Sequence, residues 1–273
     1  MTADDSVPAT ANPTASNELI VVQDRSVCRL TLNRAARRNA LSRSLVDALG
    51  HAVASVAAGD GTRVVVLDGA GPVFCAGGDI AEFSASEGGD RARADAKGLV
   101  DLLAAMTACP VPIVARVHGA AYGGGVGLLC AADIVVAAEG TAFSLSEARL
   151  GLVPAVVGPY VFAALGVREA MARMLLATPF EVEDALRCGL VHRAVPADDL
   201  AAATDDVVGS LLRGAPGALA AIKRFPALVA GFDPATTRDA MAELLVERLG
   251  SDEAREGLRA FLEKRPAAWV ESR

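Results

Sequence analysis

The chain has 273 residues and a formal net charge of −7, and its composition is 52% hydrophobic but only 4% aromatic. The acidic balance and the scarcity of rings argue against nucleic-acid binding, and the charge also argues against anionic membranes. No apolar run approaches the roughly 20 residues that cross a bilayer, and the N-terminus lacks the order of a secretion signal. We therefore expect a cytoplasmic protein of one large domain, with or without an appendage.

The first half of the chain alternates expected strands and helices. Residues 1–17 are polar, have almost no large apolar side chain, and are expected to be disordered. Helical periodicity follows the N-cap candidate Ser42 and recurs over 91–107. Runs of β-branched and apolar residues predict strands over 19–23, 27–32, 63–68, 111–117 and 134–137.

From residue 156 onward the pattern becomes helical. Helices are expected over 156–165, 168–177, 182–188, 198–213, 218–229, 236–249 and 252–264. Strands alternating with helices, followed by a helical tail, predict an α/β fold. We therefore expect an α/β core over 18–200 and a C-terminal helical region over 201–273.

Two glycine-rich turns, each directly after a predicted strand, are the most informative feature. The first runs from Phe74 to Ile80 and the second from His118 to Gly125. Glycine lets another group approach the backbone closely, and a turn that opens a helix leaves outward-pointing N–H groups. Two such turns would aim one N–H each at a single oxygen, which is how an oxyanion hole is built. Glu147 follows in an otherwise apolar segment.

These segments resemble the crotonase family of enoyl-CoA hydratases and isomerases, over about residues 18–269. The matches include Asn39-Ala40-Leu41, Ala132-Asp133-Ile134, Gly189-Leu190-Val191 and the C-terminal stretch from Glu256 to Pro266. The resemblance implies a spiral of β-β-α repeats whose last helices pack into trimers, which commonly pair into hexamers. It implies an acyl-CoA thioester as substrate, with coenzyme A as part of that substrate and no separate cofactor or metal.

The resemblance also implies the catalytic groups. The backbone N–H groups of Ala76 and Gly124 would stabilise the negative charge that grows on the thioester oxygen, and Glu147 would move the proton. Familiar hydratases hold water with two glutamates, but this chain has Gly127 at the position of the first. The segment from Leu145 to Tyr160 looks like bacterial enoyl-CoA or methylglutaconyl-CoA hydratases, which tend to carry that glycine.

Three functions stay open at this point. Hydration of a 2-enoyl-CoA is the first choice, and Δ3,Δ2-enoyl-CoA isomerisation with Glu147 as the single base is a close second. The third is a degenerate fold that binds acyl-CoA without turnover, which Gly127 keeps in play. The product separates the first two, because solvent oxygen reaches C3 only in hydration.

Further residues are assigned to substrate binding by the resemblance. Residues near the adenine and phosphates of CoA would be Ala40, Asp79, Ile80, Phe261 and Lys264, the lysine often reaching a neighbouring subunit's site. A candidate basic patch consists of Arg37, Arg38, Lys264 and Arg265.

Other polar and reactive residues near the two turns need separate interpretation. Tyr122 adjoins the glycine triplet and is a candidate for shaping the acyl pocket. His118 and Asp133 are expected to be structural, and Cys75 is not expected to be a nucleophile because its turn offers no neighbouring base.

Overall fold

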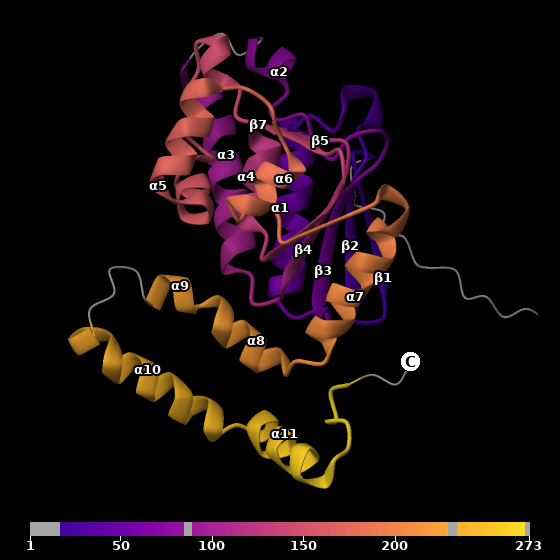
Figure 1. Cartoon of the computed structure of the whole chain (residues 1–273), viewed down its shortest axis with the longest axis vertical. Coiled ribbons are helices and arrows are strands. Elements are labelled where there is room, and N and C mark those ends of the chain that lie inside the picture. Colours follow the sequence, from indigo (N-terminus) through magenta and orange to yellow (C-terminus); the bar gives the residue numbers. More distant parts are fainter. Residues whose placement is uncertain (1–16, 85–88, 229–233, 271–273) are drawn as a thin grey trace, which may run out of the picture.

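A six-stranded sheet forms the centre of the protein (Figure 1). The computed structural model describes residues 17–84, 89–228 and 234–270. Strands β1 and β2 pair antiparallel, and the remaining neighbours in the order β1-β2-β3-β4-β6-β9 are parallel. The strands are β1 (Leu19–Asp24), β2 (Val27–Leu32), β3 (Val64–Gly69), β4 (Ile113–Val117), β6 (Ile134–Ala138) and β9 (Arg193–Val195). The predicted strands are all present.

A second, three-stranded sheet lies beside the ends of the first. It consists of β5 (Ala120–Tyr122), β7 (Ala142–Ser144) and β8 (Phe180–Glu181), in the order β5-β7-β8. These strands and β9 were not predicted, because segments of two or three residues show no measurable periodicity. β5 lies within the second glycine turn, so this small sheet sets the position of that turn.

Helices cover both faces of the large sheet. Alternate residues of a strand point to opposite faces, so Val65 and Leu67 join one core cluster while Val64 and Val66 join another. The first cluster is closed by α1 (Arg43–Ala57), α3 (Gly89–Ala108), α4 (Gly124–Ala131) and α5 (Gly158–Leu176). The second is closed by α7 (Leu200–Leu212) on the opposite face (Figure 1).

Local signals explain several helix ends. The Ser42 hydroxyl accepts a hydrogen bond from Leu45 N–H, as expected of the N-cap of α1. The two helices predicted over 156–165 and 168–177 form the two parts of α5, which meet at a kink where Gly166 is non-helical at φ 73°. The remaining short elements of this part are α2 (Ile80–Ser84), α6 (Val182–Arg187), and the 3₁₀ turns η1 (Ala35–Arg37), η2 (Glu147–Leu150) and η3 (Ala197–Asp199).

The C-terminal helices leave the sheet after α7 and lie below it in Figure 1. They are α8 (Pro216–Lys223), α9 (Phe225–Leu228), α10 (Pro234–Leu249) and α11 (Asp252–Glu263). The expected boundary at residue 200 falls on the first residue of α7, which packs on the sheet; the division into 18–200 and 201–273 stays a prediction. Of the expected disordered segment, residues 1–16 lie outside the described residues.

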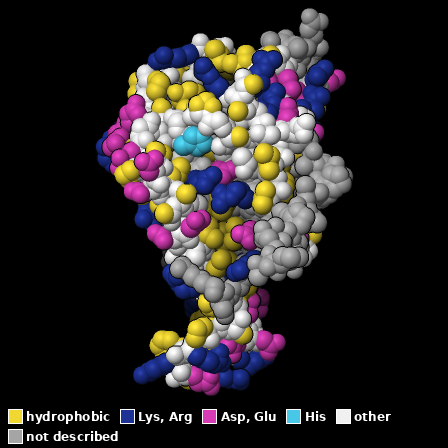
Figure 2. Space-filling model, turned by 90° about the vertical axis from the view of Figure 1, so that its right-hand side faces the viewer, with side chains coloured by type: hydrophobic (Ala, Val, Ile, Leu, Met, Phe, Trp, Pro, Cys, Tyr) yellow, Lys and Arg dark blue, Asp and Glu magenta, His cyan; other side chains and the backbone are white. Residues whose placement is uncertain are grey.

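The surface matches the acidic, mixed-charge composition. On the face drawn in Figure 2, basic and acidic side chains are interspersed with hydrophobic ones. Several large apolar side chains of α10 and α11 are exposed, among them Val246 at 67% and Phe261 at 81%. Within the described ranges, no helix combines the length and apolar character that a membrane span requires. The trimer or hexamer stays a prediction.

Candidate active site

The two glycine turns contact each other directly. Cys75 N–H donates to Ala120 C=O at 3.1 Å, and Tyr122 N–H donates to Cys75 C=O at 2.9 Å. At Gly125, a Cβ atom would lie 2.8 Å from the Cys75 carbonyl oxygen. Only glycine therefore lets the start of α4 pack this closely on the first turn.

The first turn is also bound to the loop before α1. Leu41 N–H donates to Gly77 C=O at 2.7 Å, and Asp79 N–H donates to Leu41 C=O at 3.1 Å, so Leu41 and Gly78 form a parallel bridge. The C=O of Gly77 and the N–H of Asp79 thus face the loop, and the N–H of Gly78 itself faces the other way. Among the described residues it has no hydrogen-bond acceptor.

The second free amide belongs to Gly124, the first residue of α4. An N–H at this helix position has no partner within the helix, and it carries the positive end of the helix dipole. Gly124 N lies 3.6 Å from the Cβ position of Gly77, and Gly78 N lies 3.7 Å from the Cβ position of Gly124. In the described ranges neither N–H has an acceptor, so the unpaired amides of Gly78 and Gly124 adjoin one another.

This arrangement corrects the assignment of Ala76. Its N–H donates to the Arg38 carbonyl at 2.9 Å and is not available to a ligand. The reason is Gly77, whose φ of 94° reverses the alternation of the strand, so that the outward amide falls at residue 78 and not at residue 76. Gly124 keeps its expected place beside the first turn.

The side chain of Glu147 lies beside the start of α4. The carboxylate oxygen Oε1 lies 3.0 Å from the Cβ position of Gly123, the residue directly before Gly124. The other oxygen, Oε2, is buried and has no hydrogen-bond partner among the described residues. Burial raises the pKa of this carboxyl above its ordinary value, while a bond from its own backbone N–H acts in the opposite sense.

Gly127, where a second carboxylate was considered, is closely packed. The Cγ1 atom of Val157 lies 2.4 Å from its Cβ position, closer than a real contact allows. Val157 is itself 3% exposed. The space beside Gly127 is thus already filled by a hydrophobic side chain, and Glu147 is the carboxylate that lies beside Gly123, the residue directly before Gly124.

The other residues predicted to lie in or near the first turn differ in their bonding partners and in their exposure. Asp79 forms an ion pair with Arg34 at 3.0 Å and accepts Ala81 N–H at 3.1 Å. Burial would raise the pKa of Asp79, but the bonds from Arg34 and from the start of α2 hold it below its ordinary value. Ala40 C=O accepts a bond from Arg34, Arg38 is exposed, and Ile80 is 61% exposed.

Phe261 and Lys264 are not brought to this site within one chain. Both lie at the end of α11, and α11 and α2 stand at opposite ends of the molecule in Figure 1. Arg265 bonds to Glu256 and Glu263 at 2.6 and 2.7 Å, so its guanidinium is already paired. Tyr122 is the last residue of β5 and is half-buried beside the glycine triplet.

The structure also gives the partners of Asp133 and His118 and the environment of Cys75. Asp133 Oδ2 accepts Ile113 N–H at 2.7 Å, and His118 Nε2 lies 2.8 Å from Gly71 C=O, so both have backbone partners as expected. Burial raises the pKa of the Cys75 thiol to about 12, which leaves it protonated and a poor nucleophile.

A cavity of about 250 Å³ adjoins the first turn. Gly78 lines it, together with Leu41 and Val46 of the segment around the start of α1, Leu99 of α3, and Val156. The cavity was not predictable, because its walls come from segments far apart in the chain.

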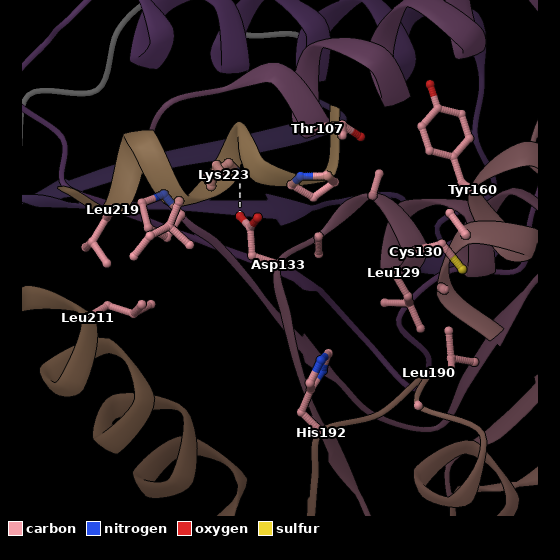
Figure 3. A pocket seen from close by; sticks show the side chains of 18 residues that line it. Thr107, Leu129, Cys130, Asp133, Tyr160, Leu190, His192, Leu211, Leu219 and Lys223 are labelled. Atoms are coloured by element: carbon pink, nitrogen blue, oxygen red, sulfur yellow. Dashed lines mark hydrogen bonds and ion pairs between the residues drawn. The ribbon is translucent and has the colours of Figure 1, made fainter. Parts of the chain in front are cut away.

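A second cavity, of about 570 Å³, lies elsewhere. It is lined by residues at the end of α4, from α5 and from α8, and the Lys223–Asp133 ion pair forms part of its wall (Figure 3). The His192 ring also faces it, and its Nδ1 accepts Val135 N–H at 3.1 Å. Because none of Gly78, Gly124 and Glu147 lines this cavity, it is not the candidate active site.

Comparisons with known proteins identify the family of this chain. Residues 23–272 match the family model described as enoyl-CoA hydratase/isomerase. A probable enoyl-CoA hydratase of Rhodobacter capsulatus is 37% identical over 90% of this chain and 92% of its own. A putative enoyl-CoA hydratase of Thermus thermophilus is 31% identical, over 91% and 99%.

Solved structures show the same fold. Pseudomonas aeruginosa AtuE superposes with a TM-score of 0.89 at 36% identity, covering 93% of this chain and 100% of its own. An enoyl-CoA hydratase from Shewanella pealeana gives 0.89 at 32% identity, over 94% and 97%. The chain belongs to the enoyl-CoA hydratase/isomerase family and has the crotonase fold.

Proposed function

We propose that this protein is an enoyl-CoA hydratase, which adds water across the C2=C3 double bond of a 2-enoyl-CoA. The observation that carries the proposal is the pair of unpaired amides at Gly78 and Gly124 beside the carboxylate of Glu147. The names of the relatives support the same reaction. No cofactor is required, because the substrate's own thioester supplies the electron sink.

The two amides would bind the thioester oxygen. As hydroxide is added to C3, electrons move toward that oxygen, and donors fixed in a water-poor site stabilise it more in the transition state than in the substrate. Each such donor contributes about 3–4 kcal/mol to lowering the barrier. The dipole of α4 acts in the same direction at Gly124.

Glu147 would carry the proton. Its carboxylate takes a proton from water as the oxygen bonds to C3, and the same carboxyl then gives a proton to C2, so that the net change is addition of H and OH. The raised pKa assists the first half of this cycle, since it makes the carboxylate a stronger base toward water than an exposed glutamate.

Isomerisation is the second candidate, and the filled space beside Gly127 favours it. With no second carboxylate to hold water, a single base could remove a proton from C2 of a 3-enoyl-CoA and return it to C4. The same amides would stabilise the dienolate between the two steps.

Product analysis in ¹⁸O-water tests the proposal. Incubation with crotonyl-CoA should place ¹⁸O at C3 of 3-hydroxybutyryl-CoA, whereas an isomerase would convert 3-hexenoyl-CoA to 2-hexenoyl-CoA without incorporation. Glu147→Gln should lose at least about 10²-fold in turnover while its affinity for butyryl-CoA changes little. Absence of hydrated product from every enoyl-CoA would overturn the hydratase.

A further inference from the structure

The loop that carries Leu41 has an unfavourable backbone conformation. Arg38 and Asn39 are consecutive non-glycine residues with positive φ, at 52° and 54°. Left-handed geometry is disfavoured for residues that have a Cβ atom, and it persists where the surrounding structure holds it. Because Leu41 pairs with the first glycine turn at Gly78, whatever holds this loop also affects the direction of the Gly78 amide.

The side chain of Asn39 holds the loop to the segment that follows β3. It is fully buried, and its Nδ2 donates to the carbonyls of Ala70 and Val73 at 2.8 and 2.9 Å. Its Oδ1 accepts the backbone N–H of Arg34 at 2.9 Å. None of these three bonds reaches residues 74–80, the first glycine turn, so Asn39 does not by itself fix the loop against that turn.

The guanidinium of Arg34 joins the loop to the turn. Its Nη1 donates to the Ala40 carbonyl, and its Nη2 bonds to Asp79 Oδ2 at 3.0 Å. Ala40 directly precedes Leu41, and Asp79 directly follows Gly78. One side chain, only 12% exposed, therefore connects the residues that flank the two members of the backbone bridge.

Glu18 holds Arg34 in place from a third direction. Its Oε1 pairs with Arg34 Nε at 2.7 Å, while its Oε2 accepts the hydroxyl of Ser42 at 2.6 Å and also that of Ser44. The guanidinium thus has a partner at Nε and at both terminal nitrogens. Three bonds from one planar group fix its orientation, which the single ammonium of a lysine would not reproduce.

The direction of the Gly78 N–H follows from these contacts. This amide has no acceptor among the described residues, and the bonds of its neighbours orient it: Gly77 C=O accepts Leu41 N–H, and Asp79 N–H donates to Leu41 C=O. A hydrogen bond weakens steeply as its angle closes, and an oxyanion donor acts through its fixed geometry. A rotation of this peptide would therefore weaken the donor without removing it.

We propose that Arg34 is a positioning residue, which keeps the N–H of Gly78 aimed at the thioester oxygen by holding the Leu41–Gly78 bridge in register. This inference rests on the proposed function, because it assumes that the Gly78 amide binds that oxygen. Arg34 acts through Ala40 and Asp79, and it neither touches the reacting atoms nor transfers a proton.

Binding of acetoacetyl-CoA tests the inference without turnover. Loss of a C2 proton to solvent converts this compound to an enolate, which carries negative charge on the thioester oxygen and absorbs in the near ultraviolet, where the keto form does not. The parent should raise the enolate fraction on binding. Arg34→Met should bind the enolate at least about tenfold more weakly and lower kcat for crotonyl-CoA about 10²-fold, the loss expected of a displacement of about 1 Å. Its affinity for butyryl-CoA should change little, since the ground-state carbonyl depends less on the donor.

Arg173→Met is the matched control. Arg173 is 17% exposed and pairs with Glu169 and Asp184 at 2.6 and 3.3 Å, so it also loses two ion pairs, but it lines neither cavity. This variant should keep the kcat and the bound enolate of the parent. Arg34→Lys keeps the charge but not the three bonds, and it should show most of the loss. Should Arg34→Met fail to fold, Arg34→Lys and Glu18→Gln perturb the same contacts with smaller changes.

Four results would overturn the inference: a parent that does not enrich the enolate, folded Arg34 variants with the enolate fraction of the parent, full activity of Arg34→Lys, or an equal loss in Arg173→Met. A general loss of structure would instead lower the affinity for butyryl-CoA in parallel with kcat, and that result also contradicts a positioning role. Failure of the proposed function has a different signature. The enolate would form and depend on Arg34, but no enoyl-CoA would be hydrated.

Discussion

Val157 Cγ1 lies 2.4 Å from the place that a Cβ atom at Gly127 would take. The two residues come from α4 and from the segment just before α5, and both are buried. Because the valine fills this space, packing requires a glycine at position 127. A single-carboxylate site is therefore part of how these helices fit together.

Gly127→Ala should lower the free energy of unfolding by about 1–3 kcal/mol, because the added methyl group overlaps Val157. Helix propensity alone predicts the opposite sign. The matched control is Gly50→Ala in α1, where no atom lies within 4 Å of the Cβ position, and this variant should gain about 0.5–1 kcal/mol. Urea unfolding measures both.

Adding Val157→Ala to Gly127→Ala should recover part of the loss, and the double-mutant cycle should show a coupling energy of about 0.5–3 kcal/mol. Strictly additive effects would contradict the contact between these two residues.

Gly78→Pro should lower kcat by about 10²–10³ because it removes the backbone N–H of one proposed donor. Affinity for butyryl-CoA should fall much less, since the ground-state carbonyl depends less on that donor than the transition state does. Steady-state kinetics and calorimetry separate the two effects, and circular dichroism checks the fold. A folded proline variant with the kcat of the parent would exclude Gly78 as a donor.

The pH dependence of kcat/KM should report Glu147. The carboxylate must be ionised to take a proton from water, so activity should fall as the pH drops through its pKa. Burial raises that pKa, and the midpoint of the acidic limb should therefore lie above the ordinary value of 4.5. A midpoint at or below 4.5 would mean that another group controls this limb.

The difference in stability between Glu147→Gln and the parent should also depend on pH. A raised folded-state pKa means that the folded protein holds the proton more tightly than the unfolded chain, so stability declines as the pH rises above about 4.5. Glutamine removes this cost. At pH 7 the variant should be more stable than the parent by about 0.5–2 kcal/mol, and the gain should vanish toward pH 4. Thermal unfolding at both pH values tests this expectation.

Lys223→Met should destabilise the attachment of α8 to the core. The lysine side chain is only 9% exposed and pairs with Asp133, which is 30% exposed. Removing one partner of such a pair leaves a partly buried charge, but the bond from Ile113 N–H still satisfies Asp133 in part, so we expect a loss of about 1–3 kcal/mol. Hydrogen exchange should show the largest loss of protection in α8, and Lys223→Met combined with Asp133→Asn should be less harmful than the sum of the two.

The family, the order of the longer strands and helices, and Glu147 as the candidate base could be predicted from the sequence, because these depend on local motifs and on periodicity. The first oxyanion donor was assigned two residues too early, to Ala76 in place of Gly78, since counting along a strand does not reveal the reversal at Gly77. Likewise, nothing local to Gly127 shows that Val157, thirty residues later, fills the adjacent space. Close tertiary contacts of this kind require coordinates.

The backbone bonds between the Leu41 loop and the first glycine turn have a consequence for inhibitor design. Since Ala76, Gly77 and Asp79 are all bonded to Arg38 or Leu41, the Leu41 loop aims the amide of Gly78. Leu41 also lines the cavity, so a compound that displaces this loop from the turn would misdirect the amide and alter the wall of the cavity at the same time.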